Sequence, residues 1–175
     1  MEFKPLIKKA RKGDKDALLQ LIMAQQADYY KLAYVYMKNE EDALDVLQDM
    51  IIILYRNISG LRKEESFYSW SKTILVNCCK KKLRHKNKTV FLDQATAESV
   101  DGVYAESEER LVLEKHLSGL SDIHQEVIRL RYFLDMEYEA IAELLKIPLG
   151  TVKSRLNKGM KQLKESFGGD IDGQY

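Results

Sequence analysis

Residues 147–164 read IPLGTVKSRLNKGMKQLK, and this stretch decides how the sequence is interpreted. From Pro148 onward it contains five lysines and arginines and no acid. Its apolar residues recur at helical spacing, so five of them fall on one side of a helix. We therefore predict a helix over residues 149–166 with an inward-facing apolar side made of Leu149, Val152, Leu156, Met160 and Leu163.

The opposite side of this helix carries residue types that suit DNA. Lys and Arg contact phosphates or guanine edges, Asn pairs with adenine, and Ser and Thr reach either. The pattern alone fits a solvated basic helix equally well, or a helix on a membrane or an acidic protein, although a membrane-surface helix usually carries Trp or Phe on its apolar side. The candidate DNA contacts are Thr151, Lys153, Ser154, Arg155, Asn157, Lys158 and Lys161.

The preceding segment favours DNA. Residues 138–147 read YEAIAELLKI, which predicts a short helix over 138–145 followed by a tight turn. Two short helices joined in this way have the layout of a helix-turn-helix, in which the second helix enters the major groove.

Composition indicates an all-α chain. Of its 175 residues 45% are apolar and 31% are charged, and only two are prolines, so helices are rarely interrupted. The net charge of +1 is uninformative, but the charges are blocked along the chain. Residues 66–92 hold seven Lys or Arg and no acid, whereas residues 93–109 hold six acids and no Lys or Arg. Two anion-binding surfaces separated by an acidic connector would give this pattern.

Several functional classes find no support. The cysteines, Cys78 and Cys79, are adjacent, and no cysteine or histidine spacing suggests a metal site. No Gly-rich phosphate loop or catalytic triad is present, so we expect no cofactor, no metal and no enzymatic activity. The N-terminus is unlike a secretory signal. The longest apolar run, residues 50–55, is too short to span a bilayer, so we expect a cytoplasmic protein without direct membrane insertion.

The hydrophobic pattern predicts two helical domains. In the first, residues 1–88, we expect helices over 15–37, 40–58 and 67–86, with Asp14 before the first of them as its N-cap or as a turn residue. The apolar stripe of the second helix is made of Ala43, Leu44, Leu47, Met50, Ile51 and Leu54. Residues 89–107 are predicted to be a flexible acidic linker. In the second domain, residues 108–168, helices are expected over 108–117, 123–133, 138–145 and 149–166, before a disordered tail over 169–175.

The C-terminal pattern is similar to that of a known family. The run MEYEAIAELLKIPLGTVKSRL, residues 136–156, resembles the helix-turn-helix of bacterial extracytoplasmic-function (ECF) sigma factors. GLSDIHQEVIRLRYF, residues 119–133, resembles the start of sigma region 4. Ala140 and Leu149 depart from the family's usual residues. The resemblance implies that the helix over 149–166 recognises the −35 promoter element.

The N-terminal part also resembles this family. NEEDALDVLQDMIIILYRNI, residues 39–58, resembles the helix of sigma region 2. The resemblance implies that its polar members bind the clamp helices of the polymerase β′ subunit, and the three acids share a helix face at spacings i, i+3 and i+7. Without the resemblance they read as an ordinary solvated face. These residues are Asp42, Asp45, Gln48 and Asp49.

Residues 61–86, LRKEESFYSWSKTILVNCCKKKLRHK, resemble the loop and helix that meet the −10 element. The loop over 59–66 is the candidate for holding a flipped base, which must recover the cost of unstacking. The basic end of the helix could instead be solubilising, since cations there complement the helix dipole. The candidate −10 contacts are Ser59, Gly60, Arg62, Lys63, Ser66, Lys72, Asn77, Lys80, Lys81 and Arg84.

The resemblance extends over roughly residues 6–167 and implies an alternative sigma factor. Its expected partners are core RNA polymerase, through the β′ clamp helices and the β flap, promoter DNA, and a membrane-anchored anti-sigma factor that would hold it at the inner face of the membrane. The acidic connector would thread toward the RNA exit path. The competing hypothesis is a dimeric helix-turn-helix regulator that binds a palindromic operator without polymerase.

Overall fold

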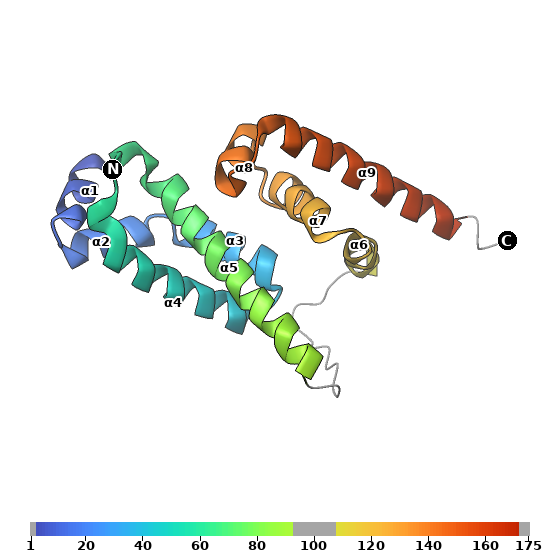
Figure 1. Ribbon diagram of the computed structural model, residues 1–175, viewed down its shortest axis with the longest axis horizontal. Helices are drawn as coiled ribbons and strands as arrows, with labels where there is room; N and C mark the ends of the chain where they lie inside the picture. Colours follow the sequence, from blue (N-terminus) through green and yellow to red (C-terminus); the bar gives the residue numbers. More distant parts are fainter. Residues whose placement is uncertain (1–2, 93–107, 172–175) are drawn as a thin grey trace. The chain divides into compact units, whose positions relative to one another are not determined.

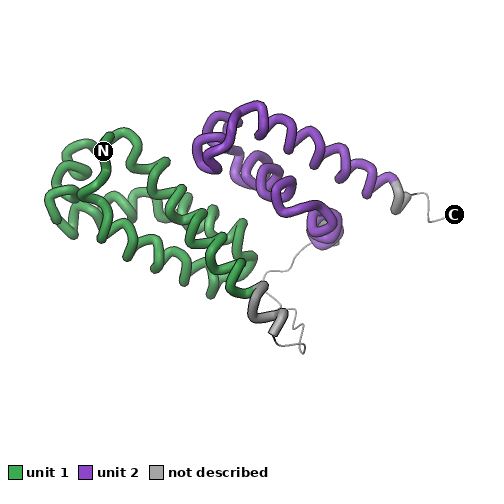
Figure 2. Tube along the Cα trace, viewed as in Figure 1, with its two compact units in different colours: residues 1–102 green, residues 103–175 purple. Residues whose placement is uncertain are grey.

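The computed structural model describes residues 3–92 and 108–171, and every secondary-structure element in these two ranges is a helix. The all-α fold class is therefore confirmed. The chain divides into two compact units, residues 1–102 and 103–175 (Figure 2). The predicted domain boundaries stay a prediction, because residues 93–107 of the proposed linker lie outside the described residues.

Over its described residues, 3–92, unit 1 is a bundle of five helices and two 3₁₀ turns (Figure 1). Helices α3, α4 and α5 pack pairwise against one another, and α1 packs on α2 and on both turns. The elements are α1 (Phe3–Arg11), α2 (Lys15–Met23), α3 (Gln26–Met37), α4 (Glu40–Asn57), η1 (Ile58–Gly60), η2 (Glu64–Ser66) and α5 (Phe67–Leu92).

The single helix predicted over residues 15–37 is wrong, because the chain breaks at Ala24 and Gln25. The apolar periodicity hides the break, since Leu21, Ile22 and Tyr29 are buried on both sides of it. Asp14 does cap α2, with its carboxylate accepting from the Ala17 N–H at 3.0 Å. The sequence interpretation missed α1, which buries only Ile7 and Ala10 among exposed lysines.

The core of unit 1 is completed by α5. Phe67 and Leu75 are fully buried and Trp70 is half-buried. The Tyr29 hydroxyl and Ser71 Oγ, 2.7 Å apart, join α3 to α5 inside the core, and burial raises the pKa of Tyr29 to about 12. This pair satisfies two polar groups that would otherwise be costly to bury.

The apolar stripe predicted for α4 is partly wrong. Leu44 and Ile51 are 45% and 39% exposed, whereas Val46 is fully buried. The face that packs against α3 and α5 carries Ala43, Val46, Met50 and Leu54. Leu44 and Ile51 lie outside this buried face, on the surface of unit 1.

Unit 2 carries the helix-turn-helix. It comprises α6 (Glu108–Ser118), α7 (Asp122–Ile128), a π-helical turn η3 (Arg129–Phe133), α8 (Tyr138–Leu145) and α9 (Leu149–Ile171). The prediction of one continuous α-helix over 123–133 is wrong, because the α-helix ends at Ile128 and a π-helical turn follows it. Two expected non-helical stretches are shorter than predicted, because α5 runs through residues 89–92 and α9 through 169–171; residues 172–175 lie outside the described part.

None of the helices within residues 3–92 and 108–171 combines the length and apolar character needed to cross a bilayer.

Candidate nucleic-acid interface

The turn of the helix-turn-helix is closed by backbone hydrogen bonds. Helix α8 ends at Lys146, which adopts a left-handed conformation (φ 55°), and the Ile147 N–H donates to Ala142 O at 3.1 Å. Pro148 O then accepts from the Thr151 N–H at 2.9 Å, which opens α9. The two helices predicted from the sequence are thus held in a fixed turn.

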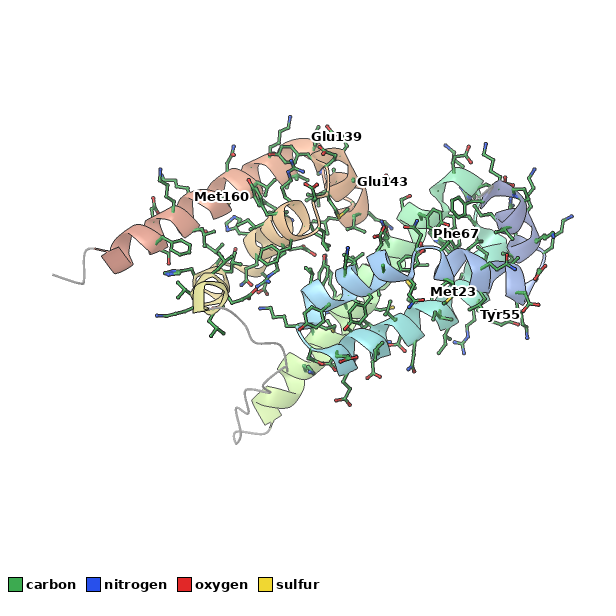
Figure 3. The ribbon with its side chains drawn as sticks, turned by 180° about the vertical axis from the view of Figure 1, so that it is seen from behind. Met23, Tyr55, Phe67, Glu139, Glu143 and Met160 are labelled. Carbon is green, nitrogen blue, oxygen red and sulfur yellow. The ribbon has the colours of Figure 1, made fainter. Side chains whose placement is uncertain are left out.

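The inward face of α9 differs from the prediction at two positions. Val152, Leu156 and Leu163 are buried as expected, but Leu149 is only half-buried and Met160 is 39% exposed (Figure 3). Its neighbour Gly159 takes the buried place. A Cβ at Gly159 would lie 2.8 Å from Ile128 Cδ1 and 3.1 Å from His124 Cβ, so α7 and α9 cross closely at a residue without a side chain.

The outward face of α9 brings the predicted DNA contacts together. Thr151 and Arg155 are half-buried at its edges, and the other five residues are exposed. Ser154 Oγ donates to Thr151 O at 3.2 Å, which turns that hydroxyl along the helix. Glu165, 3.9 Å from Lys161, is the first acid after the start of α9. Hence two turns of helix present cations and hydroxyls without a competing carboxylate.

Two arginines that the sequence interpretation missed hold the π turn η3 against α6 and α8. Arg129 is buried and donates from both terminal nitrogens to the Glu114 carboxylate, at 2.8 and 2.6 Å, which ties η3 to α6. Arg131 donates to Met136 O at 3.0 Å and lies 5.3 Å from the Tyr138 ring centroid. Both sit in the π turn, so they set the entry of the chain into α8. Periodicity alone carries no signal for either.

The end of α9 is fixed by a buried histidine. His116 Nδ1 lies 2.5 Å from Ser166 Oγ, and its ring centroid lies 4.1 Å from that of Phe167. These contacts join α6 to the last turns of α9, so α9 is held at its end as well as at its start.

In unit 1, the four polar residues predicted to bind polymerase divide into two pairs. Asp42 is buried and binds both Lys82 Nζ, at 3.0 Å, and Lys86. It also caps α4 with Asn39, whose side chain accepts from the Asp42 N–H and donates to its carboxylate, both at 2.8 Å. Asp42 therefore joins α4 to α5. Asp45 lies at the rim of this cluster, 2.5 Å from Lys82 Nζ.

Electrostatics fix the charge of Asp42. Burial acts to raise its pKa, but hydrogen bonds from Lys86, Asn39 and Lys82 outweigh burial and lower the pKa to about 2. For Lys82, burial acts to lower the pKa, and the carboxylates of Asp45 and Asp42 raise it overall. Asp42 and Lys82 are thus both charged at neutral pH.

The remaining two residues, Gln48 and Asp49, are exposed on α4. They lie among exposed apolar side chains of the same helix, namely Leu44, Ile51, Ile52 and Tyr55. A mixed polar and apolar face of this kind is typical of a protein-binding surface.

The predicted −10 contacts lie on the η1–η2 loop and along α5. Ser59, Gly60, Arg62 and Lys63 are exposed, and Ser66 is half-buried. Within α5, Asn77, Lys81 and Arg84 are exposed, whereas Lys72, 3.8 Å from Asp28, and Lys80 are half-buried.

The basic block of α5 is divided by function. Lys82 and Lys86 face α4 and neutralise Asp42 and Asp45. Lys81 and Arg84 are exposed on the same helix and can meet an external anion.

The cysteines belong to the packing of α5. Both are free and buried, and burial raises the pKa of Cys78 and raises that of Cys79 to about 12, so neither is a reactive thiolate. Among the described residues, no group of three or more His, Cys, Asp or Glu side chains could hold a metal ion.

Comparisons with known proteins match both units. Residues 21–89 match the Sigma-70 region 2 family and residues 116–165 match Sigma-70, region 4. The RNA polymerase sigma factor SigV of Bacillus subtilis is 31% identical over 89% of this chain and 94% of its own length. The ECF RNA polymerase sigma factor SigW of the same organism is 29% identical over 95% of this chain and 97% of its own.

Solved structures share the fold. The sigma factor RpoE of Bartonella quintana, determined in complex with the anti-sigma factor NepR, superposes with a TM-score of 0.67 and 22% identity over 86% of this chain and 96% of that one. CnrH, determined in complex with the cytosolic domain of CnrY, superposes with a TM-score of 0.69 and 19% sequence identity. The superposition covers 95% of this chain and 97% of CnrH.

The fold and its two matched regions are those of an RNA polymerase sigma factor. More narrowly, the chain belongs to the ECF-type sigma factors, and it is an alternative sigma factor that directs transcription initiation. The dimeric regulator is not favoured, because the family match includes unit 1 as well as the helix-turn-helix.

Proposed function

We propose that α9 reads the −35 promoter element through Ser154, Asn157 and Lys158, with Thr151, Lys153, Arg155 and Lys161 on the flanking phosphates. The observation that carries this proposal is the acid-free, exposed face of α9, on a helix anchored by Gly159 and His116. Polar side chains on a rigid helix are what base readout in the major groove requires.

Unit 1 would act on the −10 element. The exposed loop residues and the exposed cations Lys81 and Arg84 of α5 would supply the hydrogen-bond donors and charges for a melted strand. We propose that binding of the single strand to unit 1 supplies the free energy that opens the duplex at the −10 element. Polymerase would catalyse all bond formation.

Core polymerase would bind the exposed face of α4 with its β′ clamp helices. Gln48 and Asp49 would pair with polar groups of that partner, and Ile51 and Ile52 would be buried by it. Unit 2 also exposes apolar side chains, Leu111, Val112, Ile123 and Tyr132, which suit a contact with the β flap.

An anti-sigma factor is the proposed inhibitor. The complex of RpoE with the anti-sigma factor NepR supports such a partner for this chain, and the exposed apolar side chains on both units give it surfaces to cover. We further propose that this partner is anchored in the membrane and holds the chain at the cytoplasmic face.

Transcription from a −35-dependent promoter tests the role of α9. Ser154→Ala and Lys158→Ala should each lower promoter binding by holoenzyme about tenfold, since the first removes a hydroxyl and the second a cation proposed to contact DNA. Lys164→Ala, which removes an exposed cation further along α9, is the matched control. Core binding should be unchanged in all three variants. Equal losses of core binding and promoter binding would contradict the assignment.

A further inference from the structure

The hairpin of α1 and α2, at one end of unit 1, concentrates positive charge (Figure 1). Residues 3–23 contain six Lys or Arg and two Asp, so their net charge is +4, whereas the whole chain carries +1. The rest of the chain is therefore net acidic. None of the residues proposed to contact promoter DNA or core polymerase belongs to this hairpin, so its charge calls for a separate explanation.

The lysines of α1 form a row that faces solvent. Lys4 and Lys8 stand one helical turn apart, and Lys12 continues the row in the turn after α1. Lys9 lies beside them, and all four lysines are exposed. Among the described residues, none of the four forms an ion pair with a carboxylate. Like charges one turn apart destabilise a helix, so an external anionic surface would stabilise this row.

The hairpin holds the row in place. Ile7 and Ala10 bury the opposite side of α1, which packs on α2. Gly13 has φ +96°, a conformation that favours glycine, and its N–H donates to Ala10 O at 3.0 Å. The carboxylate of Asp14 is engaged as the cap of α2, accepting from the Ala17 N–H at 3.0 Å. The lysines are therefore presented outward by a fixed turn whose nearest acid is already occupied.

The exposed side of α2 adds apolar side chains to this charge. Leu19 and Met23, one turn apart, are 54% and 56% exposed (Figure 3). Lys15 begins the same stripe, and its Nζ lies 5.1 Å from the ring centroid of Tyr55. Lys12 and Tyr55 line one pocket, so the lysine row and the apolar stripe meet at this ring. The hairpin surface consists of Lys4, Lys8, Lys9, Lys12, Lys15, Leu19 and Met23.

We propose that the hairpin surface docks on an anionic lipid bilayer, with its lysines among the head groups and Leu19 and Met23 in the interfacial layer. Clusters of roughly four to eight cations on an amphipathic surface bind anionic lipids, and buried apolar area adds to the affinity. Duplex DNA matches only the lysines, because its phosphates would leave Leu19 and Met23 in water. The docking is peripheral and needs no membrane-spanning helix.

Vesicle co-sedimentation of the purified full chain tests the role of the lysines. The vesicles are made of phosphatidylcholine, with or without phosphatidylglycerol, which supplies negative charge. We expect binding to the anionic vesicles that weakens as salt is added, and binding to the neutral vesicles that is about tenfold weaker or less. Because the vesicles contain no polymerase, DNA or partner protein, the result does not depend on the proposed function.

Lys4→Ala/Lys8→Ala should weaken binding to the anionic vesicles about thirtyfold, since each lysine near such a surface contributes about fivefold. Lys153→Ala/Lys158→Ala, which removes two exposed lysines from α9, is the matched control and should bind like the wild type. All four lysines are exposed, so both variants should fold. Equal losses in the two double variants would show a general attraction of cations to the vesicles and overturn the proposal.

Leu19→Gln/Met23→Gln tests the apolar part of the hairpin surface. This variant should bind the anionic vesicles about tenfold more weakly, with the same salt dependence as the wild type. Leu111→Gln/Val112→Gln, which changes two exposed apolar side chains of α6, is the matched control and should bind like the wild type. If Leu19→Gln/Met23→Gln had no effect, the surface would be only electrostatic and docking on a bilayer would be refuted.

A mixed-sequence DNA duplex, titrated into the chain without polymerase, tests the alternative occupant. Lys4→Ala/Lys8→Ala should bind this duplex like the wild type, because the hairpin surface is proposed to meet lipid. A loss of duplex binding as large as the loss of vesicle binding would make the hairpin a DNA-binding surface and overturn the proposal.

Discussion

Asp42 shows what a single residue contributes to this fold. Its one carboxylate receives Lys82, Lys86 and the cap residue Asn39, so it closes the start of α4 and fastens α5 to it. Removing the carboxylate would leave two lysines side by side without their counter-ion at a partly buried position. This loss costs more free energy than the loss of an exposed ion pair.

Asp42→Asn should lower the free energy of unfolding at pH 7 by about 1 to 2 kcal/mol, allowing for screening at half-exposed Lys86. The folded-state pKa of about 2 lies below the ordinary value of 3.8. The stabilisation is therefore present above about pH 4 and is lost as the pH falls toward 2. Urea denaturation at pH 7 and pH 3 measures it, and the variant should show less loss between them. Asp49→Asn, on the exposed face of α4, is the control. Equal acid sensitivity in wild type and Asp42→Asn would contradict the assignment.

Gly159 has the complementary role in unit 2, because it works by having no side chain. Gly159→Ala should destabilise unit 2 by about 1 kcal/mol, since overpacking against Ile128 and His124 exceeds the gain in helix propensity. Gly168→Ala, in the same helix with nothing within 4 Å of the added Cβ, should be neutral or stabilising. Thermal unfolding compares the two. Ile128→Val removes the closest atom and should restore part of the loss; no rescue would place the strain elsewhere.

At the scale of the helix, α4 shows how far sequence reasoning can reach. Its start and end were predicted within one residue, because Asn39 caps it and the apolar residues recur. Which of its acids are free could not be predicted. The lysines that neutralise Asp42 and Asp45 stand 44 and 37 residues further along the chain, and only packing brings them there.

For helix α9, too, spacing predicts the helix but not its contacts with other helices. Spacing predicted its position and its polar face, which the structure keeps outward. It could not distinguish Met160 from Gly159 as the contact with α7, because a glycine at a helix crossing is recognised only from the residues opposite it. The site residues themselves stay predictions until binding is measured.

Asp49→Arg tests the exposed face of α4 without touching the Asp42 cluster. We expect it to weaken binding to core polymerase about tenfold or more, because a like charge would replace an acid proposed to face basic side chains. Asp49→Asn, which keeps the shape, should lose less. Surface plasmon resonance with immobilised core polymerase gives both affinities. Normal core binding by Asp49→Arg together with lost promoter binding would show that this face meets DNA instead.

At the scale of the whole molecule, the family assignment gives the two units a common purpose. Each matches a different sigma region, and each presents its own cationic surface. The two proposed DNA contacts on one chain would bind more tightly together than either alone once polymerase holds both against one promoter. Such a division would let a chain with a net charge of only +1 act on DNA.

The most direct measurement is a pull-down of the purified full chain with core RNA polymerase, followed by run-off transcription on genomic fragments. The account predicts stoichiometric binding and discrete new start sites that core polymerase alone does not use. Absence of core binding, together with specific binding of the free chain to a palindromic duplex, would contradict it and make the helix-turn-helix that of a dimeric regulator.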